Sequence, residues 1–261
     1  MSQYDRNAYP RFGTTVGRAD AGVIDQGLRS YMLSVYNYMA LGLAFTGLAA
    51  LGAYMMAVTD NPADAAGRIR DGIMLTSFGY ALFASPLKWV VILAPLGMVF
   101  FLSARMNSMS LGAAQISFWI FAGLMGLSLS SLFLVYTHDS IARVFFITAA
   151  AFGALSLYGY TTKRDLSAFG SFLIMGLFGI IIAALVNLFL GSSALQFIIS
   201  CVGVLVFSGL TAWDTQRIKE MYDYNDDGTL SGRKAIMGAL SLYLNFINLF
   251  TMLLSLFGNR E

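Results

Sequence analysis

Long apolar stretches separated by short polar segments dominate this chain. A helix needs about twenty apolar residues to cross a hydrocarbon core of about 30 Å. The stretches long enough to do so lie at about 36–58, 88–104, 113–136, 141–160, 169–190, 195–216 and 235–257. The pattern therefore predicts an all-α, polytopic membrane protein. In it, residues 31–261 form one transmembrane domain of seven helices.

Two segments fall outside this pattern. Residues 1–30 are polar, contain Gly, Asp and Arg, and are expected to form a mobile cytoplasmic tail. The apolar run behind them is too long for the core of a signal peptide, so no cleaved signal is expected. Residues 72–86 are apolar but short, and Pro86 ends them. This segment is expected to lie at the membrane interface or to re-enter the membrane, rather than to form an eighth span.

The basic residues predict how the chain is oriented. With seven spans, 11 Lys and Arg residues lie on the side of the N-terminus and 5 on the other side. Loops rich in Lys and Arg stay in the cytoplasm. The N-terminus is therefore expected in the cytoplasm and the C-terminus outside. The short loops and the absence of mitochondrial targeting features favour a bacterial inner (plasma) membrane.

The composition supports this class of protein and excludes several kinds of site. Apolar residues make up 57% of the chain and charged residues 11%, whereas soluble domains carry about 25% charged residues. The single Cys201 excludes a disulfide within the chain and a cysteine zinc site. The single His138 excludes a site with several histidines. No resident metal, no cofactor and no nucleic-acid partner are expected; the expected surroundings are the lipid bilayer.

Small residues recur at helical spacing in two of the predicted spans. Gly42, Thr46 and Ala50 follow one stripe of the first span, and Gly179 with Ala183 begins another in the fifth. Small residues let helices approach closely where lipid supplies no hydrophobic drive. Both stripes are expected to be packing contacts.

Asp214 stands apart from the other acidic residues. It lies one turn or more inside the sixth apolar span, whereas 13 of the 14 acids fall in loops or tails. An ionisable group at membrane depth is costly unless it has a partner or water, so it marks a candidate functional site. The alternative is a carboxylate at the headgroup level that reaches water, since Arg217 and Lys219 follow closely.

Polar residues also line one face of each of the last two spans. On the sixth span the face is formed by Thr211, Asp214, Thr215 and Ile218, and on the seventh by Ser241, Asn245 and Asn248. Asparagines in the lipid core need hydrogen-bond partners within the bundle. The last span is therefore expected inside the bundle, with its polar face against that of the sixth.

A charged partner for Asp214 is available in the sequence. Arg105 ends the second span on the same side of the membrane. It is either the counter-charge or an ordinary basic anchor. A carboxyl group shielded from water but close to an Arg is expected to change charge between about pH 5 and 7. Such a group between two helices is a candidate latch, which holds polar partners when it is ionised and releases them when it is protonated.

Three motifs resemble the Bax inhibitor family, also called the transmembrane Bax-inhibitor-motif family, and its bacterial members in particular. They are residues 209–216 (GLTAWDTQ), 241–250 (SLYLNFINLF) and 163–167 (KRDLS). The resemblance implies a seven-helix fold with the last helix at the centre. It also implies that some members leak Ca²⁺ in a pH-dependent way through a pair of hydrogen-bonded aspartates. The first aspartate matches Asp214, and the basic partner at the end of the second helix matches Arg105.

The second aspartate of that pair is absent, because Asn245 stands at its position. Two carboxylates in contact titrate as a coupled pair, whereas here only one group can titrate. The amide of Asn245 can donate a hydrogen bond to Asp214 at any pH. The resemblance with this departure implies a Ca²⁺ leak with Asp214 as the proton-sensing residue, but with a weaker or more acidic pH response and less attraction for Ca²⁺.

Other functions fit the residues less well. Intramembrane proteolysis needs two catalytic aspartates, or a Ser with a base, and only one Asp and no His lies within a span, so an enzyme is not expected. The loop Asp223–Gly228 copies the start of an EF-hand, but Lys234 stands where the bidentate Glu is required. We interpret it as a solvated acidic turn. The alternative function, implied by the resemblance, is a regulatory protein that transports nothing and binds a membrane-bound AAA protease through its N-terminal tail.

Overall fold

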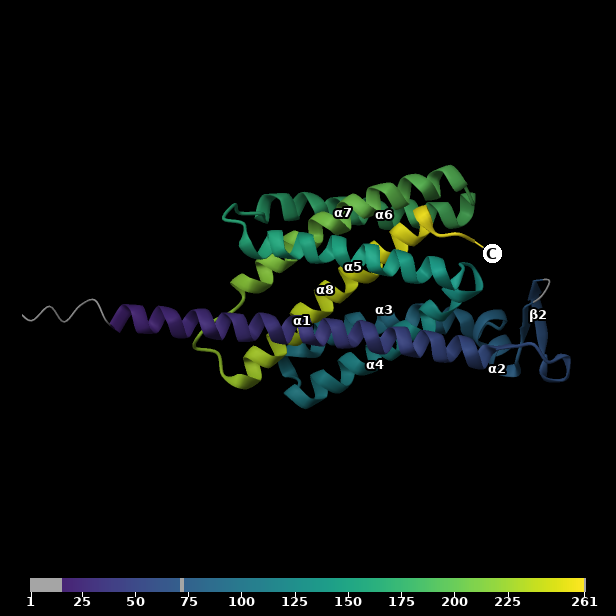
Figure 1. Ribbon diagram of the computed structural model, residues 1–261, viewed down its shortest axis with the longest axis horizontal. Helices are drawn as coiled ribbons and strands as arrows, with labels where there is room; N and C mark the ends of the chain where they lie inside the picture. The colour runs from purple at the N-terminus through teal and green to yellow at the C-terminus, as the bar shows by residue number, and fades with distance from the viewer. Residues whose placement is uncertain (1–15, 71–72, 261) are drawn as a thin grey trace, which may run out of the picture.

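The computed structural model describes residues 16–70 and 73–260, which form a bundle of long helices (Figure 1). Within the described residues, seven helices are long and apolar enough to cross a membrane. They are α1 (Val16–Ala57), α3 (Leu87–Arg105), α4 (Leu111–Leu129), α5 (His138–Thr161), α6 (Ser167–Leu190), α7 (Ser193–Glu220) and α8 (Gly228–Phe257). The seven-helix prediction is confirmed, each helix covering one predicted span.

The short connections follow from helix caps in the sequence. The side chains of Ser110, Thr137, Ser192 and Asp227 each accept a hydrogen bond from a backbone N–H in the first turn of α4, α5, α7 and α8. Such caps satisfy N–H groups that have no partner within the helix. At the other end of α6, Gly191 adopts φ +60°, a left-handed conformation that glycine adopts without strain. Helices can therefore end and restart within a few residues.

The first helix is longer than predicted. It begins at Val16, so the second half of the predicted tail is helical, and Figure 1 shows the start of α1 reaching beyond the ends of the other helices. Residues 1–15, the first half of the segment expected to be mobile, lie outside the described part of the chain.

The segment between α1 and α3 forms no span. It contains strands β1 (Val58–Thr59), β2 (Gly67–Arg70) and β3 (Ile73–Leu75), paired antiparallel in the order β1-β3-β2. A three-residue helix α2 (Ser77–Gly79) and a π-helical turn (Tyr80–Ala84) follow. The sheet and α2 lie together at one end of the bundle (Figure 1). The prediction that residues 72–86 are not an eighth span is confirmed. The small sheet was not predicted, because its strands are too short to leave a pattern in the sequence.

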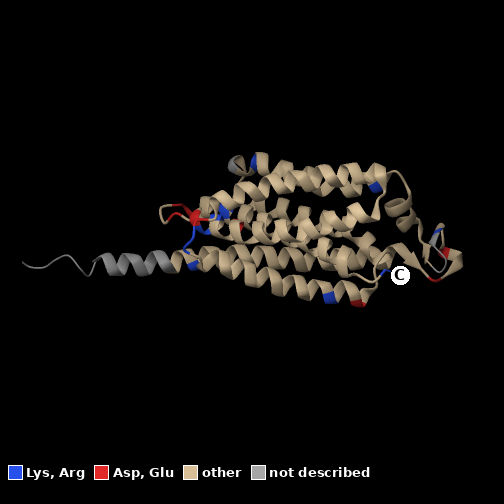
Figure 2. Cartoon of the chain, turned by 90° about the horizontal axis from the view of Figure 1, so that it is seen from above, with Lys and Arg blue, Asp and Glu red and all other residues tan. Residues whose placement is uncertain are grey.

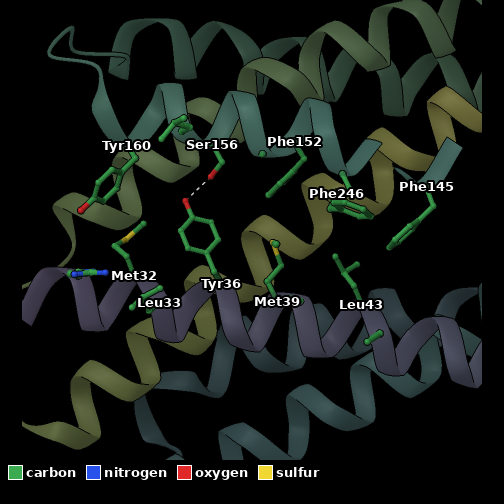
Figure 3. A pocket seen from close by; sticks show the side chains of 16 residues that line it. Met32, Leu33, Tyr36, Met39, Leu43, Phe145, Phe152, Ser156, Tyr160 and Phe246 are labelled. Atoms are coloured by element: carbon green, nitrogen blue, oxygen red, sulfur yellow. Dashed lines mark hydrogen bonds between the residues drawn. The ribbon is translucent and has the colours of Figure 1, made fainter. Parts of the chain in front are cut away.

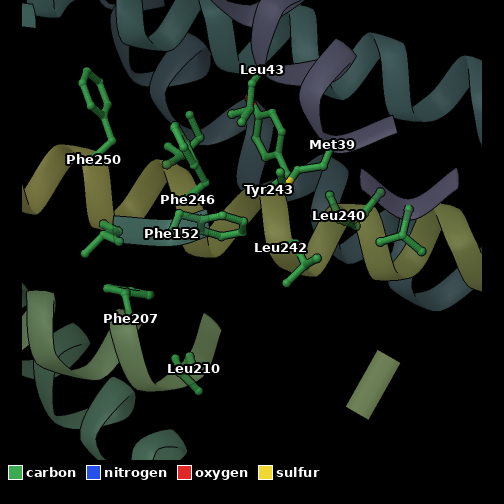
Figure 4. Packing of buried hydrophobic residues seen from close by; sticks show 14 of the residues in the cluster. Met39, Leu43, Phe152, Phe207, Leu210, Leu240, Leu242, Tyr243, Phe246 and Phe250 are labelled. Atoms are coloured by element: carbon green, nitrogen blue, oxygen red, sulfur yellow. The ribbon is translucent and has the colours of Figure 1, made fainter. Parts of the chain in front are cut away.

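Helix α8 lies at the centre of the bundle. In the most apolar stretch of α8, 56% of the residues are buried, compared with 11% in the corresponding stretches of α3 and α6. Helix α8 also contacts α1, α4, α5 and α7. Figure 4 shows Tyr243 of α8 beside Met39 and Leu43 of α1, with Phe207 and Leu210 of α7 on the opposite side of α8. The expected central position of the last span is confirmed.

The two stripes of small residues differ in the structure. Gly42 lies under the ring of Phe118, where an added Cβ would come 2.8 Å from a ring carbon, and the hydroxyl of Thr46 donates to the carbonyl of Ala122 over 2.8 Å. The stripe of α1 is therefore the contact with α4, as predicted. In contrast, nothing lies within 4 Å of a Cβ built at Gly179. Gly179 is therefore exposed on the outside of the bundle, whereas Ala183 is partly buried and packs against the core.

Lys, Arg, Asp and Glu residues lie mainly toward the two ends of the bundle, and most of its length between them carries none (Figure 2). The C-terminus lies at the opposite end from the start of α1 (Figure 1), as an odd number of crossings requires. The middle of the bundle is therefore suited to the hydrocarbon core and the ends to the headgroup regions.

Candidate functional site

The C-terminal half of α7 carries most of the candidate residues. Thr211 and Thr215 are fully buried, and each hydroxyl donates to the carbonyl one turn earlier, that of Phe207 over 2.7 Å and that of Thr211 over 2.8 Å. These hydroxyl donors are thus satisfied within their own helix. Asp214 differs, because its carboxylate accepts its hydrogen bond from a neighbouring helix rather than from α7.

Helix α8 supplies that donor. The Nδ2 of Asn245 donates to Oδ2 of Asp214 over 2.7 Å, and the two residues are only 6% and 7% exposed. Asp214 therefore does not extend outward to water at the headgroup level. A hydrogen bond to a charged group in a low-dielectric interior is stronger than one in water. The predicted pairing of the two polar faces is confirmed at this one pair of residues.

In the described part of the chain, the ion-pair partner of Asp214 comes from its own helix. Nη1 of Arg217 lies 3.8 Å from Oδ1 of Asp214, and the Arg217 side chain is 51% exposed. Its guanidinium also lies over the ring of Trp213, 5.2 Å from the ring centre. An ion pair this long with one exposed partner stabilises little. The neutral amide of Asn245 is therefore the closer partner of the carboxylate.

Of the two interpretations of Arg105, the one as counter-charge of Asp214 does not hold, because no ion pair forms between them among the described residues. Arg105 ends α3 with an exposed side chain, and α3 packs chiefly against α4 rather than α7. Arg217, one turn after Asp214, occupies the position expected for the counter-charge. The interpretation of Arg105 as a basic residue at the end of a span agrees with this placement.

The remaining residues of the α8 face make no hydrogen bond to α7 within the described part of the chain. Nδ2 of Asn248 donates to the carbonyl of Leu244 in its own helix, over 2.8 Å, and Ser241 and Asn248 are both half-buried. Asn245 alone of the three bonds to the α7 face. Two turns before Asn245, Gly238 leaves room for Ile218, whose Cγ2 would lie 3.0 Å from an added Cβ. This glycine allows α7 and α8 to approach closely.

A second polar chain was not predicted. The hydroxyl of Tyr36 on α1 lies 2.6 Å from that of Ser156 on α5, which lies 3.0 Å from that of Thr215 on α7. These three hydroxyls connect three helices beside Asp214. Single hydroxyl residues in apolar spans are common, and their partners lie far apart in the sequence. Only the packing of the helices brings them together.

The motif at residues 163–167 also has a structural partner. The side chain of Gln216 accepts from the N–H of Leu166 and donates to the carbonyl of Arg164, both over 2.8 Å. The end of α7 is thereby tied to the loop between α5 and α6. In that loop, Asp165 accepts from the N–H of Ser167 over 2.8 Å. Hydrogen bonds from the hydroxyl and then the backbone of Ser167 hold the pKa of Asp165 below its ordinary value.

The acidic turn between α7 and α8 is partly neutralised by one lysine. The ammonium of Lys234 contacts Oδ2 of Asp226 over 2.5 Å and donates to the carbonyl of Met221 over 3.1 Å. Asp227 is used as the cap of α8. Lys234 thus brings a positive charge to the loop, and no group of three or more metal-ligating acids, His or Cys occurs among the residues the structure describes. The interpretation as an acidic turn, rather than an EF-hand, agrees with this arrangement.

Comparisons with known proteins agree with the fold and the motifs. The family model described as "Inhibitor of apoptosis-promoting Bax1" matches residues 28–261. The inner membrane protein YbhL of Escherichia coli K12 is 46% identical over 90% of this chain and 94% of its own length. Uncharacterized proteins of Rickettsia prowazekii and Caulobacter vibrioides are 48% and 47% identical, over 91% and 94% of this chain and 92% and 94% of their own lengths. With a match over nearly its whole length and relatives this similar, the chain belongs to the Bax inhibitor family of membrane proteins.

Proposed function

We propose that this protein is a pH-sensitive Ca²⁺ leak of the bacterial inner membrane, with Asp214 as its proton-sensing residue. The observation that carries the proposal is the hydrogen bond between Asn245 of α8 and the buried carboxylate of Asp214 on α7. Membership of the Bax inhibitor family and the similarity to an inner membrane protein support it. The cytoplasmic N-terminus and the external C-terminus follow from the count of basic residues on each side.

The sensing mechanism rests on what a proton does to this contact. The ionised carboxylate accepts from Asn245 and attracts Arg217, the two groups that interact with it. Protonation removes the charge, so the attraction of Arg217 is lost and the bond from Asn245 weakens to one between neutral groups. The O–H of the protonated carboxyl group also needs a hydrogen-bond acceptor, because the group is buried. The contact between α7 and α8 is then less stable, and we propose that the helices separate there.

Asn245 limits the amplitude of this switch. Its amide donates to a carboxyl oxygen in either charge state, so protonation weakens the contact without abolishing it. A carboxylate at the same position would repel ionised Asp214 and couple the two titrations. The Asn245→Asp variant is therefore expected to respond more strongly to pH than the parent.

The test is Ca²⁺ flux in proteoliposomes as a function of pH, for the parent, Asp214→Asn and Asn245→Asp. We expect flux in the parent with a weak pH dependence, no pH dependence in Asp214→Asn, and a stronger one in Asn245→Asp. A parent without Ca²⁺ flux at any pH would remove the leak proposal. A pH profile that is unchanged in Asp214→Asn would remove the role of this carboxylate.

A second candidate function is regulation of a membrane-bound AAA protease by binding. The observation that favours it is the start of α1, which reaches beyond the ends of the other helices (Figure 1). Deletion of residues 1–28 separates the two functions. If Ca²⁺ flux survives the deletion while the cellular effect is lost, binding is the function; if both survive, this segment is not the contact.

A further inference from the structure

A cavity opens between α1 and α5, with α8 as its floor (Figure 3). Its volume is about 690 Å³, within the range of about 300–1,000 Å³ that is typical of ligand pockets. Its lining is apolar apart from four residues, namely Arg29, Tyr36, Ser156 and Tyr160. A site of this size is large enough for a ligand and has few groups to hold water.

The polar groups inside the groove satisfy each other. The hydroxyls of Tyr36 and Ser156 lie 2.6 Å apart and bridge α1 to α5, as Figure 3 shows. Water in a cavity needs two to four polar partners, and apolar cavities stay dry. The groove is therefore better suited to hydrocarbon than to water.

The groove opens toward the membrane. Leu33 on α1 and Leu157 on α5 line it and are 51% and 64% exposed. Nearer the middle of the two helices, Ala44 and Gly153 also line the groove and are exposed, so the groove faces acyl chains there. Gly153 widens the opening on the α5 side, because nothing lies within 4 Å of a Cβ built there.

One end of the groove is basic. Arg29 lines it and is exposed, one turn before Met32. At the same end, the ammonium of Lys219 donates to the carbonyl of Tyr160 over 3.0 Å and lies 5.0 Å from the centre of the Tyr160 ring. Basic side chains at the ends of spans lie at the headgroup level, where they attract anionic lipids.

The length of the groove matches a lipid chain. On α1 the lining runs from Arg29 to Ala44, which is about 22 Å at 1.5 Å per residue. One leaflet supplies half of a hydrocarbon core of about 30 Å. An acyl chain that starts at the basic end therefore fits along the groove to the middle of the membrane and beyond.

From these features we infer that the groove between α1 and α5 holds one acyl chain of an anionic phospholipid, whose phosphate lies at Arg29 and Lys219. The apolar walls bind the chain, and the two cations select the headgroup. This site is separate from the contact of Asp214 with Asn245. It needs no ion flux to operate.

The test fills the groove from within. Gly153→Phe places a ring in the open space beside α5, whereas Gly179→Phe makes the same change on the outer face of α6, where an added Cβ also meets nothing. Native mass spectrometry of the purified full-length protein, titrated with phosphatidylglycerol or with phosphatidylcholine of the same chains, measures the retained lipid. We expect the parent and Gly179→Phe to retain one phosphatidylglycerol and Gly153→Phe to lose it.

A further variant, Arg29→Gln, tests whether the basic end of the groove selects the lipid headgroup. The parent is expected to prefer phosphatidylglycerol about fivefold for each basic residue at the headgroup, and Arg29→Gln is expected to lose that part of the preference while it still binds lipid chains. Equal retention by the two phenylalanine variants would overturn the proposal. A parent that shows no preference between the two headgroups, or that retains palmitate in place of phospholipid, would also overturn it. So would a dimer that Gly153→Phe abolishes, because a second copy of the chain would then be the occupant of the groove.

Discussion

The hydrogen bond between Asp214 and Asn245 permits a quantitative prediction. The perturbation is a double-mutant cycle of Asp214→Ala, Asn245→Ala and the double variant. In a cycle, the cavities left by the single changes cancel and the energy of the pair remains. The bond is short, at 2.7 Å, and its partners are 7% and 6% exposed. Arg217, 3.8 Å away and half exposed, compensates little.

Two ranges bound the expected coupling energy. Hydrogen bonds to charged groups contribute about 1.5–3 kcal/mol in proteins generally. Hydrogen bonds between helices within a membrane average about 0.6 kcal/mol and reach about 1.7 kcal/mol, because the unfolded chain in the membrane also finds partners. This bond is charged, short and buried, so we expect about 1.5 kcal/mol, near the top of the membrane range.

The assay is reversible unfolding by sodium dodecyl sulfate in mixed micelles, at a pH where the parent carboxylate is ionised. Tryptophan fluorescence follows the transition, since Trp213 precedes Asp214. The matched control is the cycle of Asp214→Ala with Asn248→Ala. The side chain of Asn248 forms its hydrogen bond within α8, to the carbonyl of Leu244. That control should show additivity within about 0.5 kcal/mol. A coupling of the same small size for Asp214 with Asn245 would refute the reasoning that this bond holds α7 to α8.

Three further predictions concern the packing around the site. Gln216→Leu removes two hydrogen bonds to the loop between α5 and α6, and should destabilise the protein by about 2 kcal/mol and speed hydrogen exchange in that loop. Gly159→Ala places a Cβ 2.1 Å from a carbonyl oxygen of α7 and should cost about 1–3 kcal/mol in the same unfolding assay, whereas Gly153→Ala, in open space, should not destabilise. Asp165→Ala should lower the melting temperature in detergent at about pH 6, and by progressively less as the pH is lowered below about 4. The reason is that hydrogen bonds from Ser167 lower the pKa of Asp165. The stabilisation is therefore complete at a pH above the ordinary pKa of about 3.9, and it is lost as the pH falls through the lowered pKa. A difference in melting temperature that does not shrink at acid pH would contradict this.

The sequence alone determined the number of spans and the central position of the last one. Span length and hydropathy are properties of a contiguous stretch, so they can be read without knowledge of the neighbours. The loops are short because caps such as Ser192 and Asp227 lie directly before the helices they start. Asp214 was found in the same way, as a carboxylate inside an apolar run. Two asparagines in the last span predicted that it is covered by other helices.

Only the tertiary structure decided which side chains meet. The rotation and tilt of each helix are set by its packing against neighbours, and not by its own hydropathy. Asn245 therefore reaches Asp214 whereas Asn248, one turn further, bonds within its own helix. For the same reason Arg105 makes no ion pair with Asp214, and Tyr36 finds Ser156 at a separation of 120 residues. The groove beside Tyr36 exists because α1 and α5 are held apart over part of their length. The distance between α1 and α5 depends on the packing of several helices, so it cannot be predicted from any single stretch of sequence.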